Sequence, residues 1–252
     1  MTRCGVVWIT GAGKGIGRAL ALRYARLGHT VAASARTKTD LQSLAAEAEP
    51  LDGAIRPYAL DVTDASAVPV AVAAIEHDLG RIDRAVLNAG THIPTPVGAF
   101  SPGAWRTLLD VNVMGTVNCL AALFEDRAHR RGCRIAVVAS VAGYRGLPSA
   151  SAYGATKAAL INMCEALKPE LDALGIAVQL VNPGFVETPL TDKNDFPMPF
   201  LISAEEAARR IVDGLARDRF EIAFPTRFVM IMKMLRLLPH ALFFPITRRM
   251  VR

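Results

Sequence analysis

Short apolar runs rich in β-branched residues alternate with longer amphipathic stretches along most of this 252-residue chain. Runs of this length predict buried strands, and the amphipathic stretches between them predict helices. Such an alternation packs as βαβ units, because each helix returns the chain to the same edge of a parallel sheet. The pattern therefore predicts a doubly wound α/β fold, with a ligand crevice at the carboxyl ends of the strands.

The predicted elements cover most of the sequence. Strands are expected at residues 5–10, 30–34, 55–60, 84–88, 133–139, 177–181 and 221–224. Helices are expected at residues 15–27, 40–49, 65–79, 104–130, 152–174 and 204–216. We find no internal repeat and no interdomain linker, so one Rossmann-like domain with a seven-stranded parallel sheet is predicted for residues 1–224. Residues 225–252 are predicted to form a C-terminal amphipathic extension, not a separate domain.

A glycine-rich stretch, TGAGKGIG at residues 10–17, lies between the first predicted strand and the first predicted helix. Missing side chains let backbone N–H groups approach a pyrophosphate, and the helix N-terminus adds partial positive charge. The spacing is T-G-x-x-x-G-x-G, on Gly11, Gly15 and Gly17; in the common G-x-G-x-x-G pattern the third glycine would fall on Ile16. A glycine turn without a ligand is the alternative, but the strand–loop–helix context favours a dinucleotide.

This variant of the glycine motif resembles that of the short-chain dehydrogenase/reductase family, and further motifs of that family follow in the usual order. They are Asn88-Ala89-Gly90 after the fourth strand, Asn112 in LLDVNVMGT, Ser140 after the fifth strand, YGATK from Tyr153 to Lys157, and PGFVET from Pro183-Gly184 to Thr188. Each motif alone is weakly specific. Together they span residues 5 to about 224 and identify the chain as a member of the family.

The resemblance implies catalytic roles for Asn112, Ser140, Tyr153 and Lys157. In the family pattern the lysine also binds the nicotinamide ribose, the serine donates to the substrate oxygen, and the asparagine holds a water that relays protons to the lysine. The predicted cofactor-binding residues are Gly11, Lys14, Gly15, Ile16, Gly17, Arg36, Asp61, Val62, Asn88, Ala89, Gly90, Tyr153, Lys157, Pro183, Gly184, Val186 and Thr188.

The spacing of Tyr153 and Lys157 has its own chemical meaning. A free phenol has a pKa of ~10 and is a poor proton donor near neutral pH. Lys157 follows four residues later, on the same face of a helix. A positive charge ~4 Å from a phenolate, at an effective dielectric of ~20, favours ionisation by ~4 kcal/mol. The spacing therefore predicts that the pKa of Tyr153 is lowered toward neutrality.

The end of the second strand indicates which nicotinamide cofactor is used. Folds that prefer NAD place an acid there to bind the ribose hydroxyls. This strand ends VAASAR, with Ala35 in the acid's place and Arg36 beside it. Lys14 and Arg36 can both pair with a 2′-phosphate, so NADP(H) is predicted over NAD(H). Asp40 is interpreted as an N-cap of the next helix.

Charge and cysteine usage limit the remaining classes. The net charge of +6 comes from the end of the chain: residues 222–252 hold six basic and no acidic side chains. The rest of the chain is neutral and shows no stripe of basic residues with aromatic residues between them, which argues against nucleic-acid binding.

The five histidines lack metal-ligand spacing, so no metal site is predicted, although His92 falls in a loop near the expected site. Cysteines 4, 119, 133 and 164 are far apart and are expected to be reduced core thiols, which, with no export leader, predicts a cytoplasmic protein.

The extension reads FVMIMKMLRLLPHALFFPITRRMVR. A helix from residue 228 to 238 would place Val229, Lys233 and Arg236 on one stripe, with Met, Ile and Leu elsewhere, until Pro239 breaks it. Two charges and the proline argue against a membrane span. Two alternatives stay open: peripheral contact with a membrane surface, or packing over the substrate cleft or a neighbouring subunit.

The sequence as a whole predicts an oxidoreductase that transfers a hydride between NADP(H) and a carbonyl or secondary alcohol. An apolar substrate is expected from the bulky residues of the loop at 189–203. A noncatalytic NADP(H)-binding sensor or partner protein, and a reductase of carrier-bound 3-oxoacyl groups, are the alternatives. Apolar faces on the helix at residues 110–130 and on the helix of Tyr153 predict at least a homodimer.

Overall fold

Seven parallel strands form one sheet, as predicted. The computed structural model describes residues 5–193 and 197–251, and its strand order is β3-β2-β1-β4-β5-β6-β7. The strands are β1 Val6–Thr10, β2 Thr30–Ala35, β3 Ala54–Ala59, β4 Ile82–Leu87, β5 Arg134–Val138, β6 Ala177–Pro183 and β7 Glu221–Phe224. The order reverses between β1 and β4, and the crevice of such a sheet opens at the carboxyl ends of these two strands.

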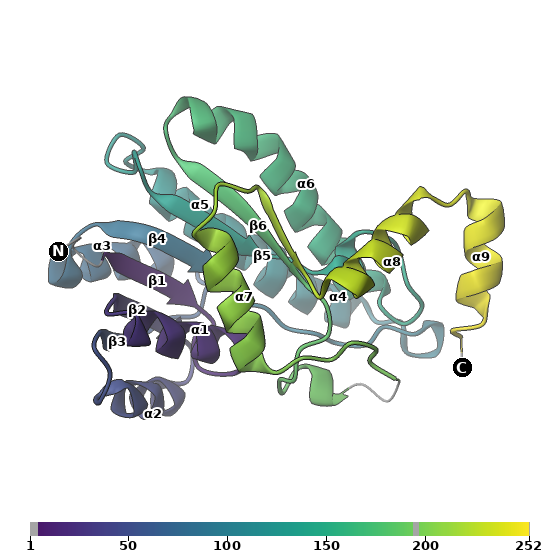
Figure 1. Ribbon diagram of the computed structural model, residues 1–252, viewed down its shortest axis with the longest axis horizontal. Coiled ribbons are helices and arrows are strands. Elements are labelled where there is room, and N and C mark those ends of the chain that lie inside the picture. Colours follow the sequence, from purple (N-terminus) through teal and green to yellow (C-terminus); the bar gives the residue numbers. More distant parts are fainter. Residues whose placement is uncertain (1–4, 194–196, 252) are drawn as a thin grey trace.

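Helices cover both faces of the sheet (Figure 1). One core packs α3, α5, α6 and α8 on one face, and the other packs α1, α2 and α7 on the opposite face. The helices are α1 Gly15–Arg26, α2 Lys38–Ala48, α3 Ala67–Leu79, α4 Pro102–Leu108, α5 Gly115–Phe124, α6 Ser151–Ala173, α7 Ala204–Leu215, α8 Thr226–Leu237 and α9 His240–Arg248. Neighbouring residues of β1 enter different cores, Trp8 the first and Ile9 the second, as the two-residue period of a strand requires.

The helix predicted at residues 104–130 is not continuous. A π-helical turn, Leu109–Met114, separates α4 from α5, and α5 ends at Phe124. Residues 125–132 form turns instead, because the side chain of Arg130 points into the body of the protein and Gly132 adopts a positive φ of 85°. The segment Pro102–Phe124 is long and apolar enough to cross a membrane, but it contributes Leu120 and Leu123 to the core.

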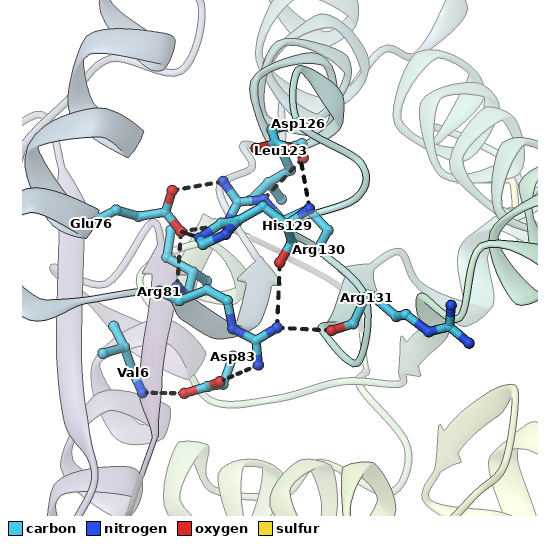
Figure 2. Close-up of polar contacts among 10 residues, drawn as sticks. Val6, Glu76, Arg81, Asp83, Leu123, Asp126, His129, Arg130 and Arg131 are labelled. Atoms are coloured by element: carbon cyan, nitrogen blue, oxygen red, sulfur yellow. Dashed lines mark hydrogen bonds and ion pairs between the residues drawn. The ribbon is translucent and has the colours of Figure 1, made fainter.

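A polar network ties the turn after α5 to the amino ends of the strands (Figure 2). Arg130 is 3% exposed and forms two hydrogen bonds with Glu76, which also accepts from the backbone N–H of Ile82 at 3.0 Å. Arg81 donates to the carbonyl of Arg131 at 2.8 Å. Burial opposes ionisation of Glu76, but these hydrogen bonds outweigh it, and the pKa of Glu76 is lowered. The network lies at the edge of the sheet opposite the crevice.

Three of the four cysteines lie in the core as free thiols, as predicted. Burial raises the pKa of Cys119 and of Cys164 to about 12 and that of Cys133 to about 11. These thiols are therefore protonated and unreactive at neutral pH. Cys4, residues 194–196 of the predicted substrate loop and Arg252 lie outside the described residues.

Two helices follow the last strand. The helix α8 ends at Leu237, and Pro239 begins α9 as its N-cap, so the break falls where the proline predicts it. Phe228 and Met232 of α8 are buried against the first core. Figure 1 shows α9 standing away from the sheet, at the end of the molecule toward which the strands point.

Candidate active site

The glycine stretch forms the turn between β1 and α1, and each of its motif glycines has a steric reason. Gly11 and Gly15 have positive φ angles of 66° and 53°. A Cβ on Gly17 would lie 2.2 Å from the carbonyl oxygen of Gly11, and one on Gly15 would lie 2.9 Å from Cγ2 of Thr188. A side chain at any of these positions would clash with neighbouring atoms of the protein. Bare backbone at a helix N-terminus fits the phosphates of a dinucleotide.

The end of β4 is fastened to this turn by hydrogen bonds. Asn88 Nδ2 donates to the carbonyl oxygens of Thr10 at 3.1 Å and Gly11 at 3.3 Å. The Thr10 hydroxyl accepts from the backbone N–H groups of Asn88 at 3.0 Å and Ala89 at 3.1 Å. Asn88 and Ala89 therefore fix the turn. Thr10, the first residue of the T-G-x-x-x-G-x-G motif, belongs with them, although it was not among the predicted cofactor-binding residues.

Asn112 is fully buried in the π-helical turn. Its Oδ1 accepts from the N–H of Thr91 at 2.7 Å, and its Nδ2 donates to the Thr91 carbonyl at 3.0 Å and to Thr156 Oγ1 at 3.1 Å. A Cβ on Gly90 would lie 3.3 Å from Asn112 Oδ1 and 3.6 Å from Lys157 Nζ. The site thus gathers Gly90, Asn112 and Lys157, and it adds Thr91 and Thr156, which no motif indicated.

Ser140 lies just beyond the carboxyl end of β5. Its hydroxyl accepts from the N–H of Ala142 at 3.1 Å and donates to the carbonyl of Pro183 at 3.4 Å. It also shares a side-chain hydrogen bond with Tyr153. Ser140 therefore joins the ends of β5 and β6 to the first turns of α6.

Tyr153 and Lys157 lie one turn apart on α6, as predicted. Lys157 is 5% exposed, its Nζ lies 5.7 Å from the centroid of the Tyr153 ring, and it donates to the carbonyl of Val138 at 3.0 Å. Burial lowers the pKa of Lys157 to about 8. Burial raises the pKa of Tyr153, and the hydrogen bond shared with Ser140 lowers it only in part.

The lowered tyrosine pKa predicted from the spacing is therefore wrong for this structure. Removing the phenolate from water costs more than the hydrogen bond with Ser140 returns. Tyr153 is therefore a protonated phenol at neutral pH in this structure.

His92 packs against the tyrosine. Its ring meets that of Tyr153 edge to face, with centroids 4.7 Å apart. The loop that carries it is held to the start of α6, where Thr95 N–H donates to the Ser149 carbonyl at 2.9 Å and Thr95 Oγ1 lies 2.9 Å from Ser151 Oγ. Sequence position placed His92 near the site, but the ring contact depends on how this loop folds.

The edge predicted to select NADP(H) carries both cations. The strand β2 ends at Ala35, and Arg36 follows as an exposed side chain without an ion pair to another described residue. Lys14 is 66% exposed and lies 3.4 Å from Asp40. The helix α2 begins at Lys38, so Asp40 lies in its first turn and is not the N-cap. This interpretation was wrong, since the helix starts two residues earlier than predicted and turns the carboxylate toward Lys14.

The remaining predicted residues line the same edge of the sheet. Asp61 and Val62 follow β3, and a Cβ on Gly115 would lie 2.6 Å from Val62. Val186 is buried and bridges to Ile202. The other predicted cofactor residues of this edge are Ile16 in the first turn of α1, Pro183 at the end of β6, Gly184 after it and Thr188, buried beside Gly15.

Comparison with known protein families shows to which family the chain belongs. The family described as short chain dehydrogenase matches residues 5–197. The chain belongs to the short-chain dehydrogenases. Members of this family are oxidoreductases whose fold binds a nicotinamide cofactor.

Relatives of this short-chain dehydrogenase are found both in sequence and in structure. It is 36% identical to an uncharacterized oxidoreductase of Myxococcus xanthus over 96% of both chains. It is 38% identical to the 3-oxoacyl-acyl-carrier-protein reductase of Thermotoga maritima, over 75% of this chain and 76% of the relative.

Two solved structures show the same fold. A short-chain dehydrogenase from Sphingobium yanoikuyae in complex with NADPH has a TM-score of 0.80 and 25% identity, covering 94% of this chain and 97% of that one. One from Burkholderia phymatum in complex with NAD has a TM-score of 0.83 and 23% identity, covering 91% of this chain and 92% of that one. Both nicotinamide cofactors thus occur among proteins of this fold.

Proposed function

We propose that this short-chain dehydrogenase is an NADP(H)-dependent reductase of apolar carbonyl compounds, working through Ser140, Tyr153, Lys157 and Asn112. The observation that carries the proposal is the partly buried phenol of Tyr153, hydrogen-bonded to Ser140 with Lys157 one turn away. A protonated phenol beside a second hydroxyl is what the oxygen of a carbonyl needs as it becomes an alcohol.

Each residue has a distinct task in this reaction. The bound nicotinamide supplies the hydride to the carbonyl carbon. Tyr153 gives its proton to the carbonyl oxygen, and Ser140 donates a hydrogen bond to the same oxygen while negative charge develops there. The cation of Lys157 stabilises the tyrosinate that is left. Asn112 holds the neighbouring backbone through Thr91.

The preference for NADP(H) rests on Arg36 and Lys14. Arg36 directly follows β2, where an NAD enzyme of this fold would carry an acid, and Lys14 lies in the glycine turn between β1 and α1. Asp40 brings a carboxylate to the same edge, but Lys14 lies 3.4 Å from it. Arg36 has no such partner among the described residues, which leaves its guanidinium available for a 2′-phosphate.

Replacing Arg36 with aspartate should lower the ratio of kcat/KM for NADPH to that for NADH by about 100-fold, since a charge-assisted pair becomes a repulsion. Steady-state kinetics with both cofactors measure this ratio. Arg26→Asp is the matched control, because Arg26 is exposed at the far end of α1 and the change in net charge is the same. An unchanged ratio in Arg36→Asp would contradict the assignment.

Aromatic side chains beside the site support an apolar substrate. Phe185 follows the Pro183-Gly184 turn and stacks on Phe228 at 5.3 Å, and Phe200 lies 6.3 Å from the same ring. The three rings come from three separate segments of the chain. They lie beside the end of β6, where the Pro183 carbonyl accepts a hydrogen bond from Ser140. Such a border favours a hydrocarbon group next to the carbonyl.

A reductase of carrier-bound 3-oxoacyl groups is the second candidate, favoured by the 38% identity to the Thermotoga maritima enzyme. A basic surface would suit an acidic carrier protein, but residues 222–252 hold the excess positive charge. Comparing one 3-oxoacyl group as a free thioester and on a carrier protein separates the candidates. A large preference for the carrier-bound form would favour this second function.

The proposal also includes a homodimer and a cytoplasmic location. Leu109 and Met114 are 41% and 48% exposed on the π-helical turn, beside the face of α6. Pairing of these faces would bury them. Sedimentation of the purified protein measures the assembly directly.

The decisive experiment measures NADPH oxidation across aldehydes and ketones of graded chain length, with Tyr153→Phe as the blank. Turnover should rise with chain length, because each buried methylene adds about 0.8 kcal/mol to binding. Tight NADPH binding without turnover on any carbonyl would instead support a noncatalytic sensor.

A further inference from the structure

The helix α8 is apolar on both of its faces. Phe228, Val229 and Met232 are buried against the body. On the opposite side Met230 is 60% exposed and Met234 is 67% exposed, and Leu237 reaches 83%. A helix on the surface of a soluble protein normally turns polar residues outward. The inner face already covers the Pro183–Phe185 turn, so the outward face needs another partner.

The helix α9, which follows α8 in the chain, also exposes apolar side chains. It buries Phe243 but leaves Leu242, Phe244 and Ile246 exposed by 58%, 55% and 44%. Nine of the nineteen large apolar side chains that are exposed among the described residues lie in residues 226–251. We call the outward side chains of these helices the tail face: Met230, Ile231, Met234, Leu237, Leu242, Phe244 and Ile246. A patch of this kind marks an interaction site.

The charges around the tail face select its partner. The five described cations of the extension are Arg227, Lys233, Arg236, Arg248 and Arg249, and no acidic residue occurs after Glu221. Among these, Lys233 pairs with Glu221, and the four arginines form no ion pair with another described residue. Pairing of two tail faces would bring these cations together without a carboxylate from either tail. An anionic surface satisfies both the cations and the apolar residues.

The helices that carry the tail face contact the loop that follows Ser140. Arg145 donates to the carbonyls of Arg236 at 3.4 Å and Leu238 at 3.3 Å, and its guanidinium lies 4.5 Å from the centroid of the Phe243 ring. One side chain thus holds the end of α8 and the middle of α9. Tyr144 adds a hydrogen bond to Glu221, the partner of Lys233.

We propose that the tail face docks on the surface of a bilayer that contains anionic phospholipid, with its apolar residues in the interface and its arginines among the headgroups. Because Arg145 ties both helices to the Ser140 loop, docking fixes the orientation of the site relative to the lipid. This inference concerns a surface outside the catalytic cluster and does not depend on which carbonyl is reduced.

Co-sedimentation of the full-length protein with vesicles tests the proposal without any measurement of turnover. The protein should bind vesicles of phosphatidylcholine with about 30% phosphatidylglycerol much more tightly than phosphatidylcholine alone, and less tightly at high salt. A triple change, Met234→Ser, Leu237→Ser and Phe244→Ser, should weaken binding at least about tenfold. Changing Arg227, Arg236, Arg248 and Arg249 to Gln should weaken it by a similar or larger factor, at about fivefold per cation.

Matched changes at exposed apolar residues elsewhere, Leu27→Ser, Val70→Ser and Leu174→Ser, should leave vesicle binding unchanged. Failure of the full-length protein to bind anionic vesicles would overturn the proposal. Equal loss of binding in the control would overturn it as well. If the tail-face variant instead dissociates an oligomer of a protein that ignores vesicles, the face is a subunit interface and not a lipid surface.

Discussion

Tyr153→Phe should lower kcat by about a thousandfold and leave NADPH affinity near that of the wild type. The substitution removes the one hydroxyl that shares a hydrogen bond with Ser140 and has a buried cation one turn away. Loss of a positioned general acid typically costs a factor of ~10²–10⁴. Stopped-flow or steady-state NADPH oxidation measures kcat, and fluorescence titration of NADPH measures the affinity.

A second tyrosine provides the control for this experiment. Tyr58 donates a hydrogen bond to Asp78 on the surface, and Tyr58→Phe removes a hydroxyl without touching the site. It should retain full turnover. Turnover retained in Tyr153→Phe would remove Tyr153 as the proton donor, whereas loss of NADPH binding in that variant would indicate a disturbed fold.

Glu76→Gln should lower the free energy of unfolding by about 3 kcal/mol at pH 7. Arg130 is 3% exposed and also donates to the Leu123 carbonyl at 3.0 Å, so its guanidinium cannot turn to solvent for a new partner. A buried charge that loses its counterion is destabilising by ~3–5 kcal/mol. Chemical denaturation of both proteins measures the difference, provided that unfolding is reversible.

The pH dependence of this difference has a defined sign. In the folded protein the pKa of Glu76 lies below its ordinary value of 4.5. The ionised carboxylate therefore adds stability at neutral pH, and this stability is lost as the pH falls through the folded pKa. The two proteins should therefore become similarly stable in acid. Asp172→Asn, which breaks an exposed pair with Lys168 on α6, should stay within about 0.5 kcal/mol of wild type. A Glu76→Gln effect as small as that would contradict the buried-pair argument.

The sheet and the glycine turn could be predicted because they depend on local sequence. Strand periodicity and length are visible in a single chain, and Gly17 is required by a close approach within its own turn. The motif residues of the site followed from the family resemblance, and the structure places Ser140, Tyr153 and Lys157 together. Their chemical roles stay predictions.

Other features depend on tertiary packing and could not be predicted. The spacing of Tyr153 and Lys157 predicted that the lysine charge lowers the pKa of the phenol. It did not show that the phenol is removed from water, which raises this pKa instead. The contact of Asp40 with Lys14 could not be predicted, because the two residues are 26 positions apart in the sequence. The sequence of the C-terminal extension shows a mixture of cations and apolar residues. It does not show that α8 buries one apolar face and exposes the other.

The π-helical turn at Leu109–Met114 joins α4 to α5 without a break in the helical path. A regular helix would be more favourable there, since each residue would keep its standard hydrogen bond. The widened turn accommodates one residue more than a straight path needs, and it directs Asn112 toward Thr91 and Thr156. Deleting a residue here would restore regular winding but rotate Asn112 about 100° away from these partners. The π-helical turn, and not a regular helix, therefore brings Asn112 to Thr91 and Thr156.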